Sequence, residues 1–296
     1  MTRKSTCVVL LFLLLFASAI CDAQTATCTN WKFFTSGQPN GINRWGTVVG
    51  GKSQGSRPTQ FGYIRYSDGT FKTYMAPSAL DTVFSGRNAL GVTVGGYTDN
   101  SPMLLSHGLV VSGSHAVTVD YPGATSTGLS GINYWGTIVG NYTTNSGGPY
   151  NYTAGAFKLK NGVFSRIIYP GSNANSTYVS SINDKGVIVG TYGDTNGADN
   201  HGFVLANGVF KTLDNPKGSS PDVTILIDIN GSGAIVGWYY VGPIGHSFLY
   251  INGVFKEIAP PNTNYTLVTG INGYGDVTGT TNFNSGGYTS FTAHCQ

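Results

Sequence analysis

The chain has 296 residues, with 16 Lys and Arg against 13 Asp and Glu, so its formal net charge is only +3. This balance lacks the electrostatic footprint of a protein that binds nucleic acid or an anionic membrane. Only 10% of the residues are charged, 43 are glycine, and Tyr, Phe, Val, Ile and Thr are abundant. That composition is typical of strands and turns rather than helices.

The first residues have the layout of a secretory signal peptide. Two basic residues give a positive start, the run 8–16 is apolar throughout, and several small residues follow it. The apolar run is shorter than the roughly 20 residues that a transmembrane helix needs. We expect cleavage after Ala23 to remove residues 1–23, although cleavage after Ala19 fits the same pattern. The mature protein should then be secreted, or periplasmic.

Cleavage at this point leaves two of the four cysteines, Cys28 and Cys295, at opposite ends of the mature chain. In an oxidising compartment a lone pair of cysteines is expected to form one disulfide. Lipid attachment at Cys21 is an alternative, but Ile20 stands where a lipoprotein signal needs a small residue. No later segment is apolar enough to predict a membrane span.

One ten-residue pattern recurs along the mature chain, which is the signature of a repeat protein. Each copy has an Asn-x-x-Gly turn or a close variant, followed four residues later by a second Gly. The asparagines are spaced 45, 45, 50, 47 and 42 residues apart. The six copies occupy residues 41–50, 86–95, 131–140, 181–190, 228–237 and 270–279.

Unit 176–216 shows how each copy becomes four short strands. Asn183 to Gly186 has the residues of a tight turn, and Asn207-Gly208 is a strong hairpin signal. A polar loop separates the second and third strands, and Pro216 marks the connection to the next unit. The strands are expected at 176–182, 187–192, 202–206 and 209–213.

Four-stranded sheets that recur every 40–50 residues or so predict a β-propeller. The tight turns make hairpins within one sheet, whereas the Pro-marked stretches can cross from one sheet's outer edge to the next sheet's inner strand. A β-helix has a shorter repeat, and a sandwich has no reason to repeat its sequence. We therefore predict one all-β domain over 24–296, a six-bladed propeller of four-stranded antiparallel blades.

The two ends of the chain should close this ring. The sixth unit has three expected strands, after which the chain ends, while residues 31–34 form a strand near the mature N-terminus. That N-terminal strand should complete the last blade from outside and so remove the open edges of the ring. Cys28 and Cys295 would then face each other. A disulfide between them should stabilise the fold by roughly 4–5 kcal/mol in the chain-entropy model. We expect a monomer.

A second pattern lies between copies of the first. It reads HGFVLANGVF at 201–210, HSFLYINGVF at 246–255 and GAFKLKNGVF at 155–164. These segments resemble the HAF-repeat family of bacterial extracellular proteins, named for a His-Ala-Phe-like tripeptide. The resemblance covers about residues 28–295. It implies an exported, propeller-like repeat domain and no particular activity.

The residues predict no catalytic or metal site and no cofactor. Glycoside cleavage usually requires two carboxylates across the bond, and the sequence places no such pair. His107, His201 and His246 share one repeat position at the start of the third strand. Equivalent positions on different blades are too far apart to hold one ion, so these histidines should support the loop entry. The acidic loop 194–199 lacks the later Glu of a calcium loop.

Aromatic residues are the most suggestive surface feature. Trp45, Trp135 and Tyr274 stand at the third place of their Asn-x-x-Gly turns, where polar residues are usual. Flat exposed rings suit the faces of sugars, whereas the alternative is that each ring packs on the neighbouring blade's turn. A second set of tyrosines, two places after the closing Gly, should pack between blades; it comprises Tyr97, Tyr142, Tyr192 and Tyr239.

Two function classes remain open. We expect a non-catalytic extracellular binding or scaffold module whose partner is a glycan or a surface protein, with Trp45, Trp135 and Tyr274 as candidate ligand-binding residues. The alternative is an extracellular hydrolase or lyase acting on polysaccharide. Its site would lie in the central funnel of the face that carries the long loops.

Overall fold

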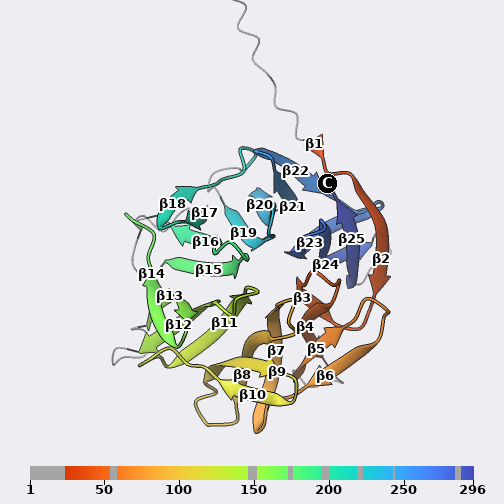
Figure 1. The fold of residues 1–296 in the computed structure, drawn as a ribbon. Helices are drawn as coiled ribbons and strands as arrows, with labels where there is room; N and C mark the ends of the chain where they lie inside the picture. Colours follow the sequence, from red (N-terminus) through yellow and green to blue (C-terminus); the bar gives the residue numbers. More distant parts are fainter. Residues whose placement is uncertain are drawn as a thin grey trace, which may run out of the picture.

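The computed structural model describes residues 24–53, 59–145, 152–172, 176–194, 200–218, 223–242, 244–283 and 288–296. Their strands form six antiparallel blades around a central axis, and Figure 1 shows the ring along that axis. These ranges contain no helix, and hence none that could cross a membrane. The predicted six-bladed propeller is confirmed, while the predicted signal peptide at 1–23 lies outside the described residues.

The blades follow one another along the chain. In five of them the four antiparallel strands are consecutive in the sequence. Blade 1 comprises β3 (Gln38–Ile42), β4 (Val48–Ser53), β5 (Gln60–Arg65) and β6 (Phe71–Tyr74). Blade 2 comprises β7 (Ala79–Arg87), β8 (Thr93–Asp99), β9 (Ser106–Ser112) and β10 (His115–Thr118). Blade 3 comprises β11 (Ser126–Ile132), β12 (Ile138–Asn145), β13 (Tyr152–Lys160) and β14 (Val163–Ile167).

The remaining blades repeat this order. Blade 4 comprises β15 (Thr177–Ile182), β16 (Ile188–Gly193), β17 (Asn200–Ala206) and β18 (Val209–Thr212), each within about two residues of its predicted bounds. Blade 5 comprises β19 (Thr224–Ile229), β20 (Ile235–Val241), β21 (Ile244–Ile251) and β22 (Val254–Ile258). Blade 6 comprises β23 (Thr263–Ile271), β24 (Asp276–Phe283), β25 (Tyr288–Cys295) and the N-terminal strand β2 (Cys28–Phe34).

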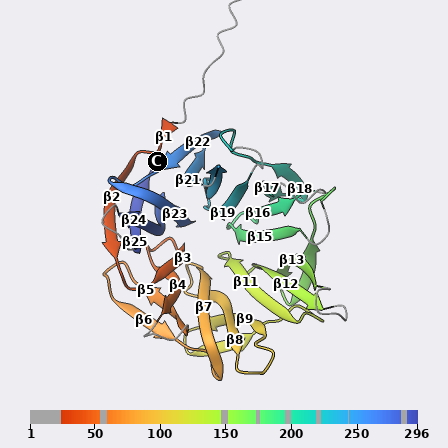
Figure 2. The ribbon, with the colours of Figure 1, turned by 180° about the vertical axis from the view of Figure 1, so that it is seen from behind.

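The tight turns all lie on one face of the ring. The Asn-x-x-Gly turns join the first and second strands, and the Asn-Gly turns join the third and fourth, so both sets project from the same strand ends. We call this side the tight-turn face. Figures 1 and 2 show the ring from its two sides.

A closed ring of asparagine side chains joins the six blades at this face. Each turn asparagine is 3–6% exposed, and its Nδ2 donates to the backbone carbonyl of the next blade's asparagine at 3.0–3.3 Å. Its Oδ1 accepts N–H groups of its own turn, as Asn183 does from Lys185 and Val187 at 3.0 Å. The last bond runs from Asn272 to Asn43 and closes the circle.

The second feature that recurs in every copy is the closing Gly, which leaves room for a neighbouring strand and a phenylalanine ring. A Cβ added at Gly190 would overlap the carbonyl of Tyr178 and meet the ring of Phe203 at 2.8 Å. Phe203 belongs to the His-Gly-Phe tripeptide and is fully buried in the apolar layer between blades 3 and 4, with Val139 and Ile182. The same arrangement recurs at Gly140 with Phe157 and at Gly237 with Phe248.

The N-terminal strand closes the ring as predicted. β2 pairs antiparallel with β25, and Figure 1 shows the red N-terminal strand along the blue C-terminal one. Cys28 lies opposite Cys295, and the two form a disulfide with a Cα–Cα distance of 4.1 Å. One further strand was not predicted: β1 (Gln24–Thr25) pairs in parallel with β22 and covers the outer edge of blade 5.

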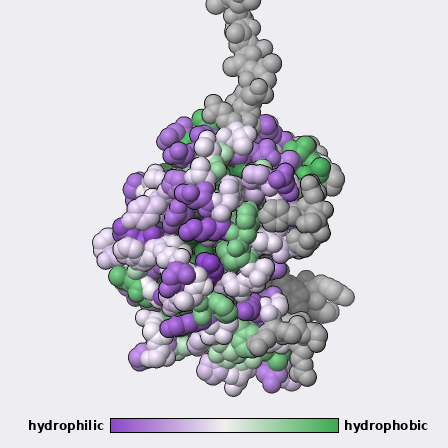
Figure 3. All heavy atoms as spheres, turned by 90° about the vertical axis from the view of Figure 1, so that its right-hand side faces the viewer, coloured by the Kyte–Doolittle hydropathy of each residue, from purple (hydrophilic) through white to green (hydrophobic). Residues whose placement is uncertain are grey.

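The outer wall of the ring beside β2 and β6 is mixed in character. Figure 3 shows polar and weakly polar residues over most of this side, with hydrophobic residues in small separate patches. Single exposed apolar residues are normal on soluble proteins and indicate no extended apolar interface.

The asparagine ring leads to a first prediction. Asn183→Ala removes one bond to blade 5 and two bonds within its own turn, so it should lower the free energy of unfolding by about 3 kcal/mol. Urea denaturation of the mature protein measures this loss. The control is Asn207→Gly, at an exposed turn position with φ 51°, which should change stability by less than about 1 kcal/mol. Equal effects of the two substitutions would contradict a special role for the ring.

The disulfide leads to a second prediction. It closes a loop of 267 residues, so the double substitution of Cys28→Ser and Cys295→Ser should lower stability by about 5 kcal/mol in the chain-entropy model. Chemical denaturation with and without reductant checks this. The unmodified protein should lose the same stability on reduction, whereas the double variant should not respond to reductant at all.

Candidate functional site

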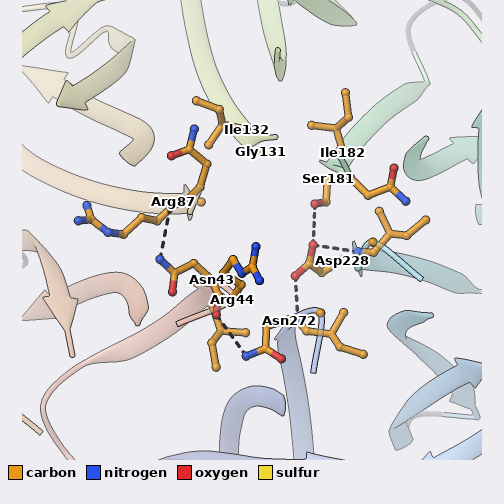
Figure 4. Close-up of a pocket in the computed structure, with 18 of the residues that line it drawn as sticks. Asn43, Arg44, Arg87, Gly131, Ile132, Ser181, Ile182, Asp228 and Asn272 are labelled. Carbon is orange, nitrogen blue, oxygen red and sulfur yellow. Dashed lines mark hydrogen bonds between the residues drawn. The ribbon is translucent and has the colours of Figure 1, made fainter. Parts of the chain in front are cut away.

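The tight-turn face opens into a cavity on the ring axis. It has a volume of about 290 Å³ and is lined by the inner strands and the Asn-x-x-Gly turns of all six blades. Figure 4 looks into this cavity, with Arg44 reaching towards its middle and Asp228 on the opposite wall. The cavity therefore lies on the tight-turn face, whereas the alternative hypothesis of an enzyme expected a funnel on the other face.

Each inner strand carries a β-bulge where it borders the cavity. In β15, for example, Val179 pairs with Gly190 and Ser181 with Val189, so the residue between them has no partner across the sheet. The same shift occurs in all six inner strands. A bulge bends the strand and redirects the side chains that follow, and here it directs the next residue towards the axis.

Asp228 is the distinctive residue of this layer. It stands two places before the turn asparagine, where the other five blades have Gly or Ser, as at Gly131 and Ser181. Ser181 Oγ donates to Asp228 Oδ1 at 2.6 Å, and the Ile271 N–H donates to Oδ2 at 2.8 Å (Figure 4). With a third bond from Ile229 N–H, one carboxylate joins blades 4, 5 and 6.

Burial controls the ionisation of this carboxylate. The protein around it disfavours the charged form and raises the pKa of Asp228 to about 6, although its three hydrogen bonds act in the opposite direction. The side chain keeps part of its surface open to the cavity, so a proton or a ligand can reach it. Asp228 is therefore a titratable group at the base of the cavity.

The predicted aromatic residues lie on the turns of the tight-turn face, and of the three, Tyr274 lines the cavity itself. Trp45 and Tyr274 are 58% and 59% exposed, and Arg44 lies between them. The Arg44 guanidinium is 4.9 Å from the centre of the Trp45 ring, and a hydrogen bond to the Tyr274 side chain raises the pKa of Arg44. Blades 6 and 1 therefore form one cluster, which we call the Trp45 cluster (Arg44, Trp45 and Tyr274).

Trp135 stands apart on blade 3 and is 73% exposed. Its Nε1 donates to the carbonyl of Asp184 on blade 4 at 3.1 Å, and Tyr134 packs edge-on against it at 5.1 Å. Trp45 makes the equivalent bond to Ala89 on blade 2 at 3.0 Å. Each indole is thus fixed to the next blade while most of its ring remains exposed. Each ring therefore contacts the neighbouring blade's turn, as the packing alternative expected, and is also exposed to solvent.

The recurring histidines have a structural role, as predicted. His201 Nδ1 bonds to Asp214 at 2.8 Å, and the other oxygen of that carboxylate accepts the N–H of Gly202. Tyr192 stacks on the same imidazole at 5.1 Å. The carboxylate partners were not predicted. Equivalent sets are Tyr97, His107 and Asp120, and Tyr239, His246 and Glu257.

The second set of tyrosines packs between blades, as predicted. Tyr142 and Tyr239 are 5% and 2% exposed, and each belongs to an apolar cluster that includes residues of the preceding blade. Among the described residues no three His, Cys, Asp or Glu side chains converge on one point, and most of the acidic loop 194–199 lies outside them.

The central cavity is lined by few charged groups. Its lining contains two carboxylates, Asp184 and Asp228, and no histidine. Asp184 accepts the N–H of Tyr134 at 2.7 Å, and Asp228 is held by three donors, so both carboxylates are already bonded. Two cationic side chains, Arg44 and Arg87, also line the cavity, together with the rings of Tyr134 and Tyr274 and many backbone groups.

Sequence reasoning missed Asp228 and the ring role of the asparagines. Asp228 has no counterpart in the other copies and belongs to no recurring carboxylate pair, yet a charged residue where the other copies have Gly or Ser is itself a signal. The asparagine recurs in all six copies while the residues beside it vary. A turn alone would also accept other residues at this position, so the recurrence indicates a further role. The bulges that direct both groups inward have no clear sequence signal.

Comparison with known proteins supports the fold alone. The sequence matches no family model and no curated protein. Similar structures include the β-propeller domain of the trilobed protease from Pyrococcus furiosus, which has an open velcro topology (TM-score 0.54, 10% identity, 90% of this chain and 81% of that one). A six-bladed fucose-binding lectin from Aleuria aurantia has a TM-score of 0.52 at 12% identity over 89% and 93% of the two chains. A candidate gluconolactonase has a TM-score of 0.51 at 14% identity over 93% and 95%.

The raised pKa of Asp228 leads to a third prediction. A carboxyl whose pKa rises on folding from 3.8 to about 6 favours the folded state fully below pH 3.8, and this stabilisation disappears as the pH rises through 6. Asp228→Asn cannot titrate. The stability of the parent relative to the variant should therefore fall by about 2.4 kcal/mol between pH 4 and pH 7. Denaturant titrations of both proteins across this range measure the difference, and a constant difference would contradict the shift.

Proposed function

We propose that the protein is a non-catalytic extracellular binding module that holds carbohydrate on its tight-turn face. The observation that carries the proposal is that exposed aromatic rings are held in fixed positions on the tight-turn face. Trp45 and Trp135 are largely exposed, yet each indole nitrogen is bonded to the next blade. A ring held in place loses little conformational freedom when a sugar stacks on it.

The composition of the tight-turn face supports this choice of ligand. Sugar faces contact aromatic rings through apolar C–H groups, while their hydroxyls need hydrogen-bonding partners. The Trp45 cluster offers both, since Arg44 supplies donors between two exposed rings. The structural similarity to a fucose-binding lectin is compatible with carbohydrate binding, although its sequence identity is only 12%.

The proposed location outside the cytoplasm has two supports. The disulfide fits an oxidising compartment, such as the periplasm or the extracellular space. The charged and apolar pattern of residues 1–23 is that of a secretory signal. Membership of the HAF-repeat family would agree with export and forms part of the same proposal.

The test combines Trp45→Ala with Trp135→Ala in the mature protein. A stacked ring contributes about 0.5–1.5 kcal/mol, so the double variant should bind its glycan roughly tenfold more weakly. A glycan array identifies the ligand, and calorimetry measures the affinity. The matched control is Leu90→Ala, at the same turn position of blade 2 and 64% exposed, which should leave binding unchanged.

Thermal melting separates binding from packing. Weaker binding with an unchanged melting temperature supports the proposal. If the parent binds no glycan and the double variant merely melts at a lower temperature, these rings only pack between turns and the proposal should be dropped.

A further inference from the structure

A second cavity lies between blades 6 and 1, where the N-terminal strand closes the ring. Its volume of about 440 Å³ falls in the range of small-molecule sites, about 300–1,000 Å³. One wall comes from β2 and β25 of blade 6, and the other from β5 and two turns of blade 1. We call it the seam cavity.

The seam differs from the other blade junctions because the repeat is interrupted there. In blades 1 to 5 a short turn joins the third and fourth strands on the tight-turn face, but in blade 6 these strands are joined by the Cys28–Cys295 disulfide. The register of β2 shifts between Thr29 and Lys32, and Asn30 has a φ of 56°. Asn30, Trp31 and Lys32, the residues at this irregular part of β2, line the seam cavity.

Two positive charges face the seam cavity from its two walls. Lys32 is exposed on β2, and Arg65 ends β5. Neither forms an ion pair with a described carboxylate. The Arg65 guanidinium lies 4.5 Å from the Phe34 ring centre, and its Nη1 donates to the Tyr66 carbonyl at 3.4 Å. These contacts orient the guanidinium and leave most of its donors for a ligand.

The one carboxylate in the lining is already bonded. Asp276 accepts Nδ2 of Asn272 at 2.9 Å and pairs with Nδ1 of His294 at 3.1 Å. No described residue bonds the other imidazole nitrogen of His294, which lines the cavity beside the hydroxyls of Ser67 and Thr292. The cavity thus combines two cationic groups with neutral hydrogen-bonding groups.

The apolar part of the lining is small. Ile42 belongs to it, whereas the Trp31 ring and the Ala293 side chain pack in the apolar layer between blades 5 and 6, with Trp31 5.2 Å from Phe291. The hydroxyls of Ser67 and Thr292 and the imidazole of His294 can bond the hydroxyls of a sugar, and the two cations can pair with an anionic substituent on it.

The seam cavity borders the Trp45 cluster. Gly46, which lines the cavity, follows Trp45 in the chain, and Asp276 lies two residues after Tyr274. Building on the proposed carbohydrate binding, we propose that the seam cavity binds an anionic sugar residue of the same glycan. Lys32 and Arg65 pair with its carboxylate or sulfate, since the planar guanidinium can hold two oxygens of either group.

The test is calorimetric titration of the mature protein with three probes: an oligogalacturonate, its methyl ester, and a sulfated neutral oligosaccharide. An anionic probe should bind, and binding should weaken at higher ionic strength. Lys32→Gln and Arg65→Gln should each weaken it by roughly 10–100-fold, the loss expected for one charge-assisted hydrogen bond. Lys160→Gln, at an exposed lysine of a blade 3 turn on the same face, is the matched control and should change nothing.

The outcomes separate this proposal from the one on which it rests. One outcome is that neutral and anionic probes bind alike, that Lys32→Gln has no effect, and that the Trp45→Ala/Trp135→Ala variant loses binding. In that case the seam cavity is overturned and the aromatic site stands. If Lys32→Gln removes binding while the tryptophan variant binds normally, the seam cavity is supported and the aromatic site falls. If no anionic probe binds, the seam cavity is overturned, whereas the aromatic site is judged by the glycan array. Lys32 is exposed, so its variant tests the proposal even if Arg65→Gln fails to fold.

Discussion

The structure depends on six buried amide groups that bind one another's backbones in a circle. Each turn asparagine must satisfy its own turn with Oδ1 and the next blade with Nδ2, so the distance between neighbouring inner strands is fixed by a side chain of one length. An unsatisfied amide buried at this depth would cost more than the bond contributes, which makes the circle cooperative. The same local chemistry therefore joins each blade to the next around the whole circle, while the N-terminal strand and the disulfide complete the last blade.

This constraint also explains where variation is allowed. The first and fourth residues of each turn are held, by the amide bonds and by the positive φ of glycine, whereas the third residue faces outward into solvent. Trp45, Trp135 and Tyr274 occupy such outward positions, so they can serve a ligand without disturbing the circle. Asp228 is different because it fills a space that other blades leave to Gly or Ser, and its hydrogen bonds to blades 4 and 6 offset part of the cost of burying a charge.

Sequence reasoning recovered the features that repetition makes visible. The strand order, the hairpin at Asn207-Gly208, the closing strand and the pairing of Cys28 with Cys295 follow from turn chemistry and from the absence of a fourth strand in the last unit. It could not recover what depends on the exact depth of a side chain. The exposure of Trp45 depends on bulges and tilts of a few ångströms, and so does the reach of Asp228 to two other blades. No residue type encodes such small shifts.

The seam illustrates why a repeat protein gains chemistry where its repeat fails. In five blades a short turn links the third strand directly to the fourth. In the sixth, a disulfide replaces the turn, so β2 can take an irregular path and Asn30 a left-handed conformation. Lys32 and Arg65 then line the seam cavity from its two walls. Neither lies within ion-pair distance of a described carboxylate, although Asp68 lies near enough to Arg65 to interact with its charge, so both cations can pair with the anionic group proposed for this cavity.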